Sequence, residues 1–158
     1  ISFLREIVTK EYITHPGVIL RKLRVDIIKT LAQTGEESTH KDGMDMSLLV
    51  VNHKENTISW AGANNPLWII RANNNNQYED IANTIEEIKP DKMPVGKHDK
   101  DSIPFTQREF DLQLGDVVYT LTDGFPDQFG GPKGKKFMYK QLMYYLTKKL
   151  WIENLEIY

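Results

Sequence analysis

Apolar residues near the start of the chain recur with the spacing of two successive helices. Over residues 1–11 the apolar side chains fall on one helical face, and Gly35 is a typical stop for the helix that follows. Pro16 suits the first turn of this second helix, because proline has no N–H group to leave unpaired. The pattern predicts helices over residues 1–11 and 15–34. The apolar positions concerned are Phe3, Leu4, Ile7, Val8, Ile19, Leu20, Leu23, Ile27, Ile28 and Leu31.

Strand-like patterns replace the helical spacing after a polar segment at residues 36–43. Residues 46–51 are almost continuously apolar, which is typical of a strand buried on both faces. The turn residues that follow, and the run at 57–61, predict a hairpin over residues 45–62. Further strands are predicted at residues 67–70, 84–88, 106–112 and 117–121, with a hairpin tip at the asparagine run 73–76.

The last part of the chain returns to helical spacing. Residues 130–134 are rich in glycine and predict a loop. Residues 136–149 predict a helix with Phe137, Leu142 and Leu146 facing inward. The predicted order is two helices, many antiparallel strands and a final helix. Because these elements are segregated rather than alternating, the order indicates an α+β fold and not a doubly wound α/β sheet.

The composition excludes several classes of function. With 20 basic and 22 acidic side chains the net charge is −2, so no strong field is available to bind nucleic acid or an anionic membrane. The absence of cysteine excludes disulfides, thiolate metal sites and a cysteine nucleophile. No apolar run approaches the roughly 20 residues of a membrane span. The length predicts one domain, and we expect a cytoplasmic chain without direct membrane contact, trimmed before Ile1.

The strongest candidate for chemistry is the end of the apolar strand predicted at 117–121. The strand runs directly into Asp123 and Gly124, so a rigid element would present a carboxylate beside a residue that leaves space for a ligand. Hard divalent cations prefer carboxylate oxygens held in this way. The dipeptide alone favours an ordinary Asp-Gly turn, so the assignment depends on the neighbouring segments.

Those segments resemble a known family. The strings DGMDMSLLVV (42–51), ISWAGANNPLWIIR (58–71), DKMPVG (91–96) and LQLGDVVYTLTDGFPDQFGGPKGKKF (112–137) occur in this order. Over about residues 1–146 the sequence resembles the SpoIIE-type branch of the PP2C-like metal-dependent serine/threonine phosphatases. The resemblance implies an antiparallel β-sandwich flanked by helices, in four layers α-β-β-α. It also implies that residues 1–158 form a single domain of this kind, incomplete at both ends.

The resemblance implies a reaction and a set of site residues. The reaction is the hydrolysis of phosphoserine or phosphothreonine by water activated by two Mn²⁺ or Mg²⁺ ions, without a covalent intermediate. Asp123 with Gly124 matches the metal-binding segment at the strand end. Asp127 matches a second, weaker acid of that segment, and Asp42 matches an accessory ligand position. For Asp42 the alternative, a solvated loop acid, is favoured.

The sequence departs from the family at both ends. The first metal motif, an Asp followed by a Gly-His-Gly turn, is absent, and so is the closing Asp-Asp motif. We expect the chain as given to be unable to complete a two-metal site, and a chain that truly lacks both motifs to have no phosphatase activity. A sequence with missing ends explains the departure better than a natural loss.

Substrate and partners follow from the same resemblance. Asn64 and Asn65 either position the substrate or satisfy backbone groups in a turn. Lys135 and Lys136 either attract a phosphoprotein or are solvated. We expect a phosphoprotein substrate of the anti-sigma-antagonist type and an upstream sensor domain, and homodimerisation is compatible with both; no nucleic-acid partner is expected. The open alternative is a non-catalytic phosphatase-fold module that binds a partner as the output of a sensor protein.

Overall fold

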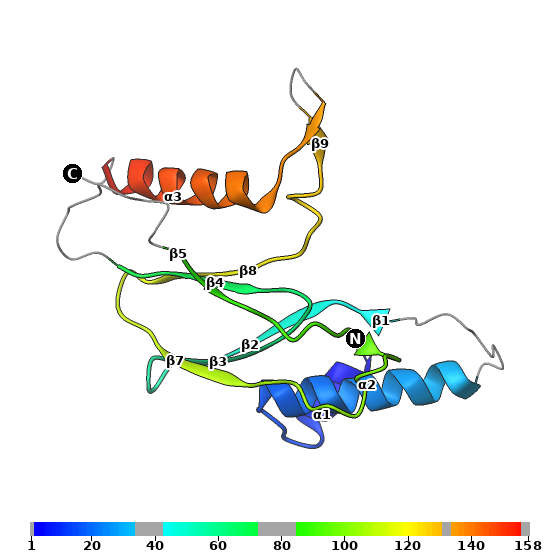
Figure 1. Cartoon of the computed structure of the whole chain (residues 1–158). Helices are drawn as coiled ribbons and strands as arrows, with labels where there is room; N and C mark the ends of the chain where they lie inside the picture. The colour runs from blue at the N-terminus through cyan, green and yellow to red at the C-terminus, as the bar shows by residue number, and fades with distance from the viewer. Residues whose placement is uncertain (1, 34–42, 73–84, 131–133, 156–158) are drawn as a thin grey trace.

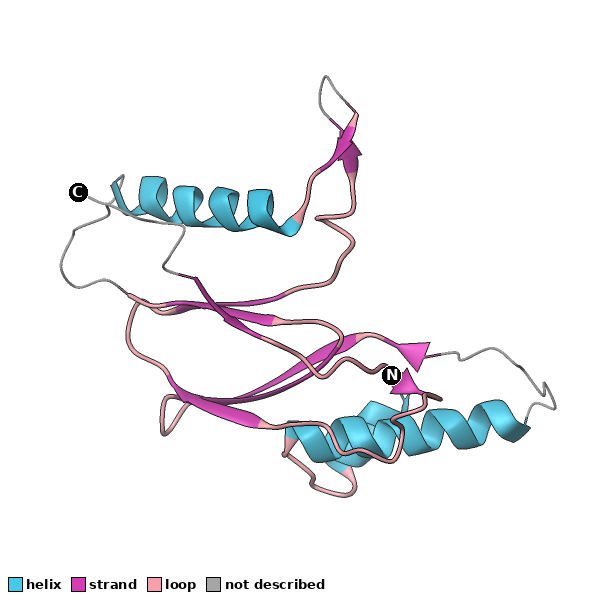
Figure 2. Cartoon of the chain, in the orientation of Figure 1, coloured by secondary structure: helices cyan, strands magenta, loops and turns pink. Residues whose placement is uncertain are grey.

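Two small antiparallel sheets pack face to face, and helices cover their outer faces (Figure 1). The helices α1 and α2 lie along one sheet and α3 lies along the other, so the layers follow the order helix, sheet, sheet, helix (Figure 2). The expected four-layer α+β architecture is confirmed. The helices are α1 (Ser2–Thr9), α2 (Pro16–Gln33) and α3 (Tyr139–Leu155). The structure, a computed structural model, describes residues 2–33, 43–72, 85–130 and 134–155, with side chains as far as Thr147.

Each of the two main sheets has a central strand with one antiparallel partner on either side. The first sheet has the order β2-β3-β7, and the second has the order β5-β4-β8. Only two residues and a proline, Asn64-Asn65-Pro66, connect the central strands β3 and β4, so the chain passes directly from one sheet to the other. The strands are β2 (Met46–Asn52), β3 (Thr57–Ala63), β7 (Arg108–Asp111), β5 (Ile85–Ile88), β4 (Leu67–Ile70) and β8 (Val117–Thr120).

The first core lies between the helices α1 and α2 and the β2-β3-β7 sheet. Ala61 and Ala63 alternate along β3 toward the helices, and their small side chains let the helices approach the sheet closely. Met93, Val95 and Phe105 come from the segment between β5 and β7 and close the side of this core. The helices contribute Ile7, Ile19, Leu20 and Leu23.

The second core lies between the two sheets. Ile58 and Trp60 of β3 face Leu67 and Ile69 of β4, and all four side chains are fully buried or nearly so. Two residues after Trp60 on β3, Gly62 has no room for a side chain. A Cβ atom there would lie 2.4 Å from Cζ2 of Trp60 and 2.5 Å from the backbone oxygen of Asn65. The glycine therefore permits the close turn from one sheet to the other.

One arginine is buried in the first core. The guanidinium of Arg24 on α2 donates hydrogen bonds to the backbone oxygens of Asp101 (2.8 Å) and Ile103 (2.9 Å). It also lies 4.0 Å from the centre of the Phe105 ring, a cation–π geometry. Burial lowers the pKa of Arg24, although the charges of Asp101 and Asp91 act in the opposite direction. Arg24 thus fastens the segment before β7 to helix α2.

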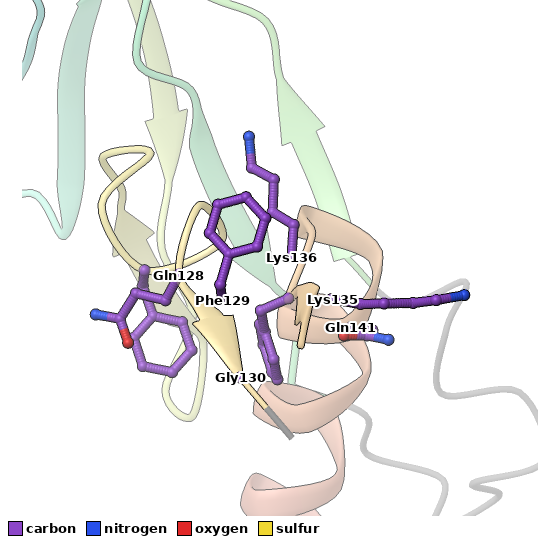
Figure 3. Close-up of a pocket in the computed structure, with 8 residues that line it drawn as sticks. Gln128, Phe129, Gly130, Lys135, Lys136 and Gln141 are labelled. Atoms are coloured by element: carbon purple, nitrogen blue, oxygen red, sulfur yellow. The ribbon is translucent and has the colours of Figure 1, made fainter. Parts of the chain in front are cut away.

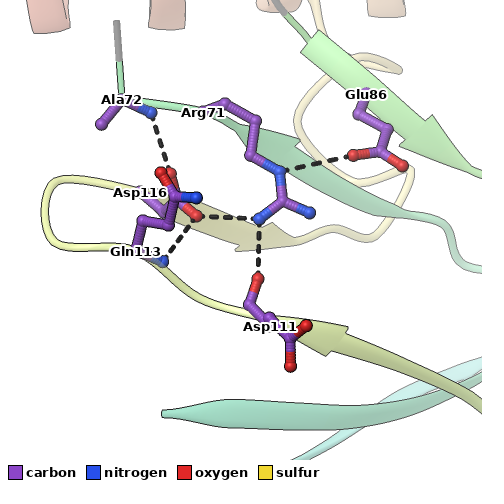
Figure 4. Close-up of polar contacts among 6 residues, drawn as sticks. All are labelled: Arg71, Ala72, Glu86, Asp111, Gln113 and Asp116. Atoms are coloured by element: carbon purple, nitrogen blue, oxygen red, sulfur yellow. Dashed lines mark hydrogen bonds and ion pairs between the residues drawn. The ribbon is translucent and has the colours of Figure 1, made fainter. Parts of the chain in front are cut away.

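At one edge of the sandwich, Arg71 and Asp116 connect the end of β4 to the turn before β8 (Figure 4). The side chain of Asp116 is 1% exposed and accepts three hydrogen bonds. The donors are the backbone N–H groups of Gln113 (3.0 Å) and Ala72 (2.8 Å) and the guanidinium of Arg71 (2.8 Å). Arg71 also donates to the backbone oxygen of Asp111 in β7, at 2.8 Å, and therefore contacts both sheets.

Several sequence predictions differ from the structure in detail. β2 and β8 are half-buried along most of their length and not buried on both faces, because each lies at the edge of its sheet among the described strands. Two short strands on either side of the glycine-rich segment, β9 (Phe129–Gly130) and β10 (Lys135–Lys136), pair as a hairpin. Consequently α3 begins at Tyr139 and not at residue 136. Two further strands, β1 (Gly43–Met44) and β6 (Val95–Gly96), pair with each other and were not predicted.

Some predictions fall outside the described residues. These are the helix stop at Gly35, the accessory acid Asp42 and the hairpin tip at residues 73–76. Within the described part of the chain, no helix is long and apolar enough to cross a membrane.

Candidate functional site

The strand register places the predicted site residues at one edge of the sandwich. β8 ends where β4 begins, because Thr120 pairs with Leu67, and β5 also ends opposite Leu67. Asp123 follows β8 by three residues, and Asn64 precedes β4 by three residues. Both therefore lie beyond the last paired residues at the same edge, which is opposite to the edge held by Arg71 and Asp116. Asp123 and the pair Asn64–Asn65 therefore follow the same end of the β4–β8 ladder, and a shared site there stays a prediction.

Asp123 begins a tight turn that leaves its carboxylate exposed. The backbone N–H of Asp127 donates to the backbone oxygen of Asp123 at 2.9 Å, so residues 123–127 form one helical turn. Pro126 is buried under this turn, whereas Asp123 and Gly124 are exposed. Among the described residues, no side chain forms a hydrogen bond or an ion pair with the Asp123 carboxylate. A carboxylate held this way by a strand end is available to an external ligand.

Asp127 is differently occupied. Its Oδ1 atom lies 2.7 Å from Nζ of Lys136 on β10, and both side chains are half-exposed. The ion pair joins the Asp123 turn to the β9–β10 hairpin. Two backbone bonds strengthen this connection, from Phe137 N–H to Gln128 oxygen (2.9 Å) and from Met138 N–H to Pro126 oxygen (2.8 Å). For Asp127 to bind a metal ion directly, its ion pair with Lys136 would have to open.

Tyr139, the first residue of α3, lies beside the same turn. Burial of its hydroxyl, and then the negative charges of Asp123 and Asp127, raise the pKa of Tyr139. Its ring meets the fully buried Trp68 edge-on, with the ring centres 5.9 Å apart. Sequence reasoning missed this residue, because the helix was predicted to begin at 136 and its N-terminal end was not connected to the strand end.

Asn64 and Asn65 both have structural tasks at this edge. Asn64 adopts a left-handed backbone (φ 59°), which asparagine tolerates better than most residues, and its side-chain amide donates to Asp45 at 2.7 Å. Asn65 is buried. Asp91 completes the arrangement, because its backbone pairs with Gly62 and Asn64 and its carboxylate accepts two hydrogen bonds from Thr106. Asn64 thus has a structural role at the turn, while the backbone-satisfying role of the Asn65 side chain and the contact of either asparagine with substrate stay predictions.

A divalent metal ion fits these residues only in part. Asp123 offers an exposed oxygen ligand of the type that Mn²⁺ and Mg²⁺ prefer. Within the described ranges, however, no three acidic or histidine side chains come close enough together to hold an ion. Within those ranges the residues therefore do not complete a two-ion centre.

A cavity of about 440 Å³ opens between the Asp123 turn, the β9–β10 hairpin and the start of α3 (Figure 3). Phe125 and Phe137 form one wall, with their rings edge-to-face and 5.3 Å between centres. Lys135 lies at the cavity, and within the described part of the chain its ammonium group has no hydrogen-bond or ion-pair partner. The two lysines, which the sequence does not distinguish, therefore differ in charge compensation, because only Lys136 is paired with Asp127. The other lining residues are Gln128, Phe129, Gly130, Lys136 and Gln141.

Comparisons with known proteins agree with this geometry. The family model described as Stage II sporulation protein E (SpoIIE) matches residues 1–155. The fold is similar to the solved SiaA-PP2C domain of Pseudomonas aeruginosa, with a TM-score of 0.70 and 21% sequence identity. The similarity covers 92% of this chain and 51% of that chain, so this chain spans about half the length of its structural relative. No curated protein sequence matches significantly. The chain belongs to the SpoIIE (Stage II sporulation protein E) family, and its fold is like that of a PP2C domain.

Proposed function

We propose that the protein containing this chain hydrolyses phosphoserine or phosphothreonine on a regulatory protein, with Asp123 as a ligand of Mn²⁺ or Mg²⁺. The observation that carries the proposal is the exposed Asp123 carboxylate at the end of β8, without a partner among the described residues. Replacing the Asp123 carboxylate by an apolar or neutral group would break no hydrogen bond or ion pair within the described residues. Its acidic character is therefore better explained by a ligand than by folding.

The chemistry divides between the ion and the side chains. A bound divalent ion would supply the activated water and neutralise charge on the phosphoryl group. Asp123 would hold the ion at the edge of the sandwich, and the ladder between β4 and β8 would fix the position of its carboxylate. Lys135 adds a positive charge on the neighbouring β9–β10 hairpin, and this charge favours the approach of an anionic substrate. The remaining ligands would have to come from residues other than those described.

The substitution Asp123→Asn in the natural protein tests the metal role. We expect metal-dependent hydrolysis of an aryl phosphate to fall at least about a hundredfold, because loss of an outer-sphere partner already costs roughly 10- to 100-fold. The affinity for Mn²⁺ measured by calorimetry should fall as well, while the free energy of unfolding should change little, since the side chain is exposed. The matched control is Asp111→Asn, because Asp111 is also an exposed acid but lies on a different strand, β7. Wild-type turnover in the Asp123 variant would refute the assignment.

A second experiment compares the 158-residue chain with the natural protein. Aryl phosphate hydrolysis is measured for each with and without Mn²⁺. Turnover by the natural protein alone would support a site completed by ligands outside the described residues. No turnover by either would refute the proposed activity and favour the non-catalytic partner-binding module.

A further inference from the structure

The cavity beside Lys135 is lined by an unusual concentration of exposed aromatic side chains. Three of the six phenylalanines in the chain, Phe125, Phe129 and Phe137, form its walls. Phe125 is 51% exposed and Phe129 is 76% exposed, so the folded domain gains little from burying them. Aromatic residues gathered on an exposed surface are characteristic of protein-binding sites, where they supply contact area at low entropic cost.

The position of the cavity connects it to the candidate site. Its first wall residue, Phe125, follows Asp123 by two positions, within the single helical turn of residues 123–127. One such turn spans about 5.4 Å, whereas an extended peptide advances about 3.3 Å per residue. The side chains that bound the cavity extend this span further, so a peptide whose phosphorylated residue lies at Asp123 would place a side chain two to four residues away at the cavity.

The charges favour an acidic partner. Lys136 is paired with Asp127 at 2.7 Å, whereas Lys135 has no such partner among the described residues. Figure 3 shows the two lysine side chains leaving the hairpin in different directions, so the Lys135 ammonium is not drawn into the same ion pair. The rim of an apolar cavity thus carries one uncompensated positive charge. A membrane surface would need a larger basic patch than a single lysine.

We propose that the cavity between Phe125, Phe129 and Phe137 binds an apolar side chain of the phosphoprotein substrate, two to four residues from the phosphorylated residue, with an acidic group against Lys135. This inference rests on the proposed phosphatase function, because that function places the phosphorylated residue at Asp123. It adds a sequence requirement for the substrate that the reaction itself does not impose.

Peptide binding tests the cavity separately from catalysis. The probes are fluorescein-labelled phosphoserine peptides of about nine residues with a leucine three positions from the phosphoserine, on either side, and the same peptides with alanine there. Binding to the natural protein is measured by fluorescence anisotropy with Mn²⁺ present, and a phosphonate in place of the phosphate ester of each peptide prevents hydrolysis. We expect one leucine peptide to bind about tenfold more tightly than its alanine counterpart, as partial burial of a leucine side chain predicts.

Two substitutions assign the preference to this cavity. Phe129→Ala should abolish the leucine preference, and because Phe129 is mostly exposed the variant should fold normally. Tyr144→Ala, a change at a 61% exposed aromatic residue of α3 outside the cavity lining, should retain the preference. Equal binding of the leucine and alanine peptides, or a preference that survives Phe129→Ala, would overturn the inference. A leucine preference without any Mn²⁺-dependent turnover would support the cavity while refuting the phosphatase function.

Discussion

Replacing Asp116 by alanine should destabilise the protein by about 3 kcal/mol. The carboxylate is almost completely buried and accepts two backbone hydrogen bonds and one from Arg71. Each backbone N–H group that loses its partner costs about 1 kcal/mol, and the bond from the half-exposed Arg71 contributes a similar or smaller amount. Because these bonds share one acceptor group, they are not independent, and the total is an upper estimate. In a domain of this size it corresponds to a decrease in Tm of roughly 6–12 °C.

Urea unfolding followed by circular dichroism measures this effect. Asp116→Asn keeps the size and one acceptor oxygen, so it should lose about half as much stability. Asp111→Asn, a change at an exposed acid, should remain within about 0.5 kcal/mol of the wild type. If Asp116→Ala also remained within about 0.5 kcal/mol, the hydrogen bonds would not stabilise the fold and the reasoning would be refuted.

The same network has a pH dependence of predictable sign. Burial alone would raise the pKa of Asp116, but the hydrogen bonds from Gln113, Ala72 and Arg71 outweigh burial and lower it. A carboxyl group with a lowered pKa in the folded state stabilises the protein above its unfolded pKa and loses this contribution as the pH falls. The stability difference between the wild type and Asp116→Asn should therefore be constant near neutral pH and shrink below about pH 4.

Three further predictions concern single side chains. Gly62→Ala should lower the free energy of unfolding by about 3 kcal/mol, because the new Cβ would overlap Trp60 and Asn65. In the control Gly130→Ala the new Cβ meets no atom of the described residues within 4 Å, so the loss should be much smaller. Asn64→Gly should be more stable than Asn64→Ala, because only the alanine is strained at φ 59°; equal stability in urea would contradict this. Lys135→Ala should raise KM for a phosphoprotein more than KM for an aryl phosphate. The increase should also exceed that caused by Lys136→Ala, because Lys136 is already paired with Asp127. Equal effects of Lys135→Ala on both substrates would show that Lys135 is an ordinary solvated lysine.

Elements with strong local patterns were predictable from the sequence. Helix α2, the β2–β3 hairpin and β4 have apolar runs of the right length between clear turn residues, and their observed bounds agree closely with the prediction. The segregated order of these elements was sufficient to indicate an α+β fold. Burial of Trp60 and Trp68 likewise follows from their places within apolar strands.

Elements that depend on distant partners were not predictable. β1 and β6 are two residues long and pair across more than fifty positions of sequence, so neither has a local pattern of its own. The β9–β10 hairpin was not predicted, because its strands are two residues long and the glycine-rich segment between them predicts only a loop. Its formation moves the start of α3, because Met138 adopts a left-handed backbone (φ 70°) and its oxygen accepts the first hydrogen bonds of the helix.

The candidate site shows the same division. Asp123 could be predicted as a candidate because an apolar strand runs directly into it, and the short β4–β8 ladder determines where it lies. The ion pair between Asp127 and Lys136 could not be predicted, because it forms across the β9–β10 hairpin. Since sequence patterns do not reveal which charges are compensated, Lys135 and Lys136 appeared equivalent until the hairpin geometry distinguished them.

Strand β8 pairs with β4, and the two ends of β8 serve different purposes. Asp116 fixes one end to Arg71, and Asp123 follows the other end. Insertion or deletion of one residue between them would shift the Asp123 carboxylate by about 3.3 Å and turn every side chain of the strand to the opposite face. The segment from Asp116 to Asp123 is therefore fixed in length. Related sequences should vary there by substitution, and differ in length only in the loops beyond it.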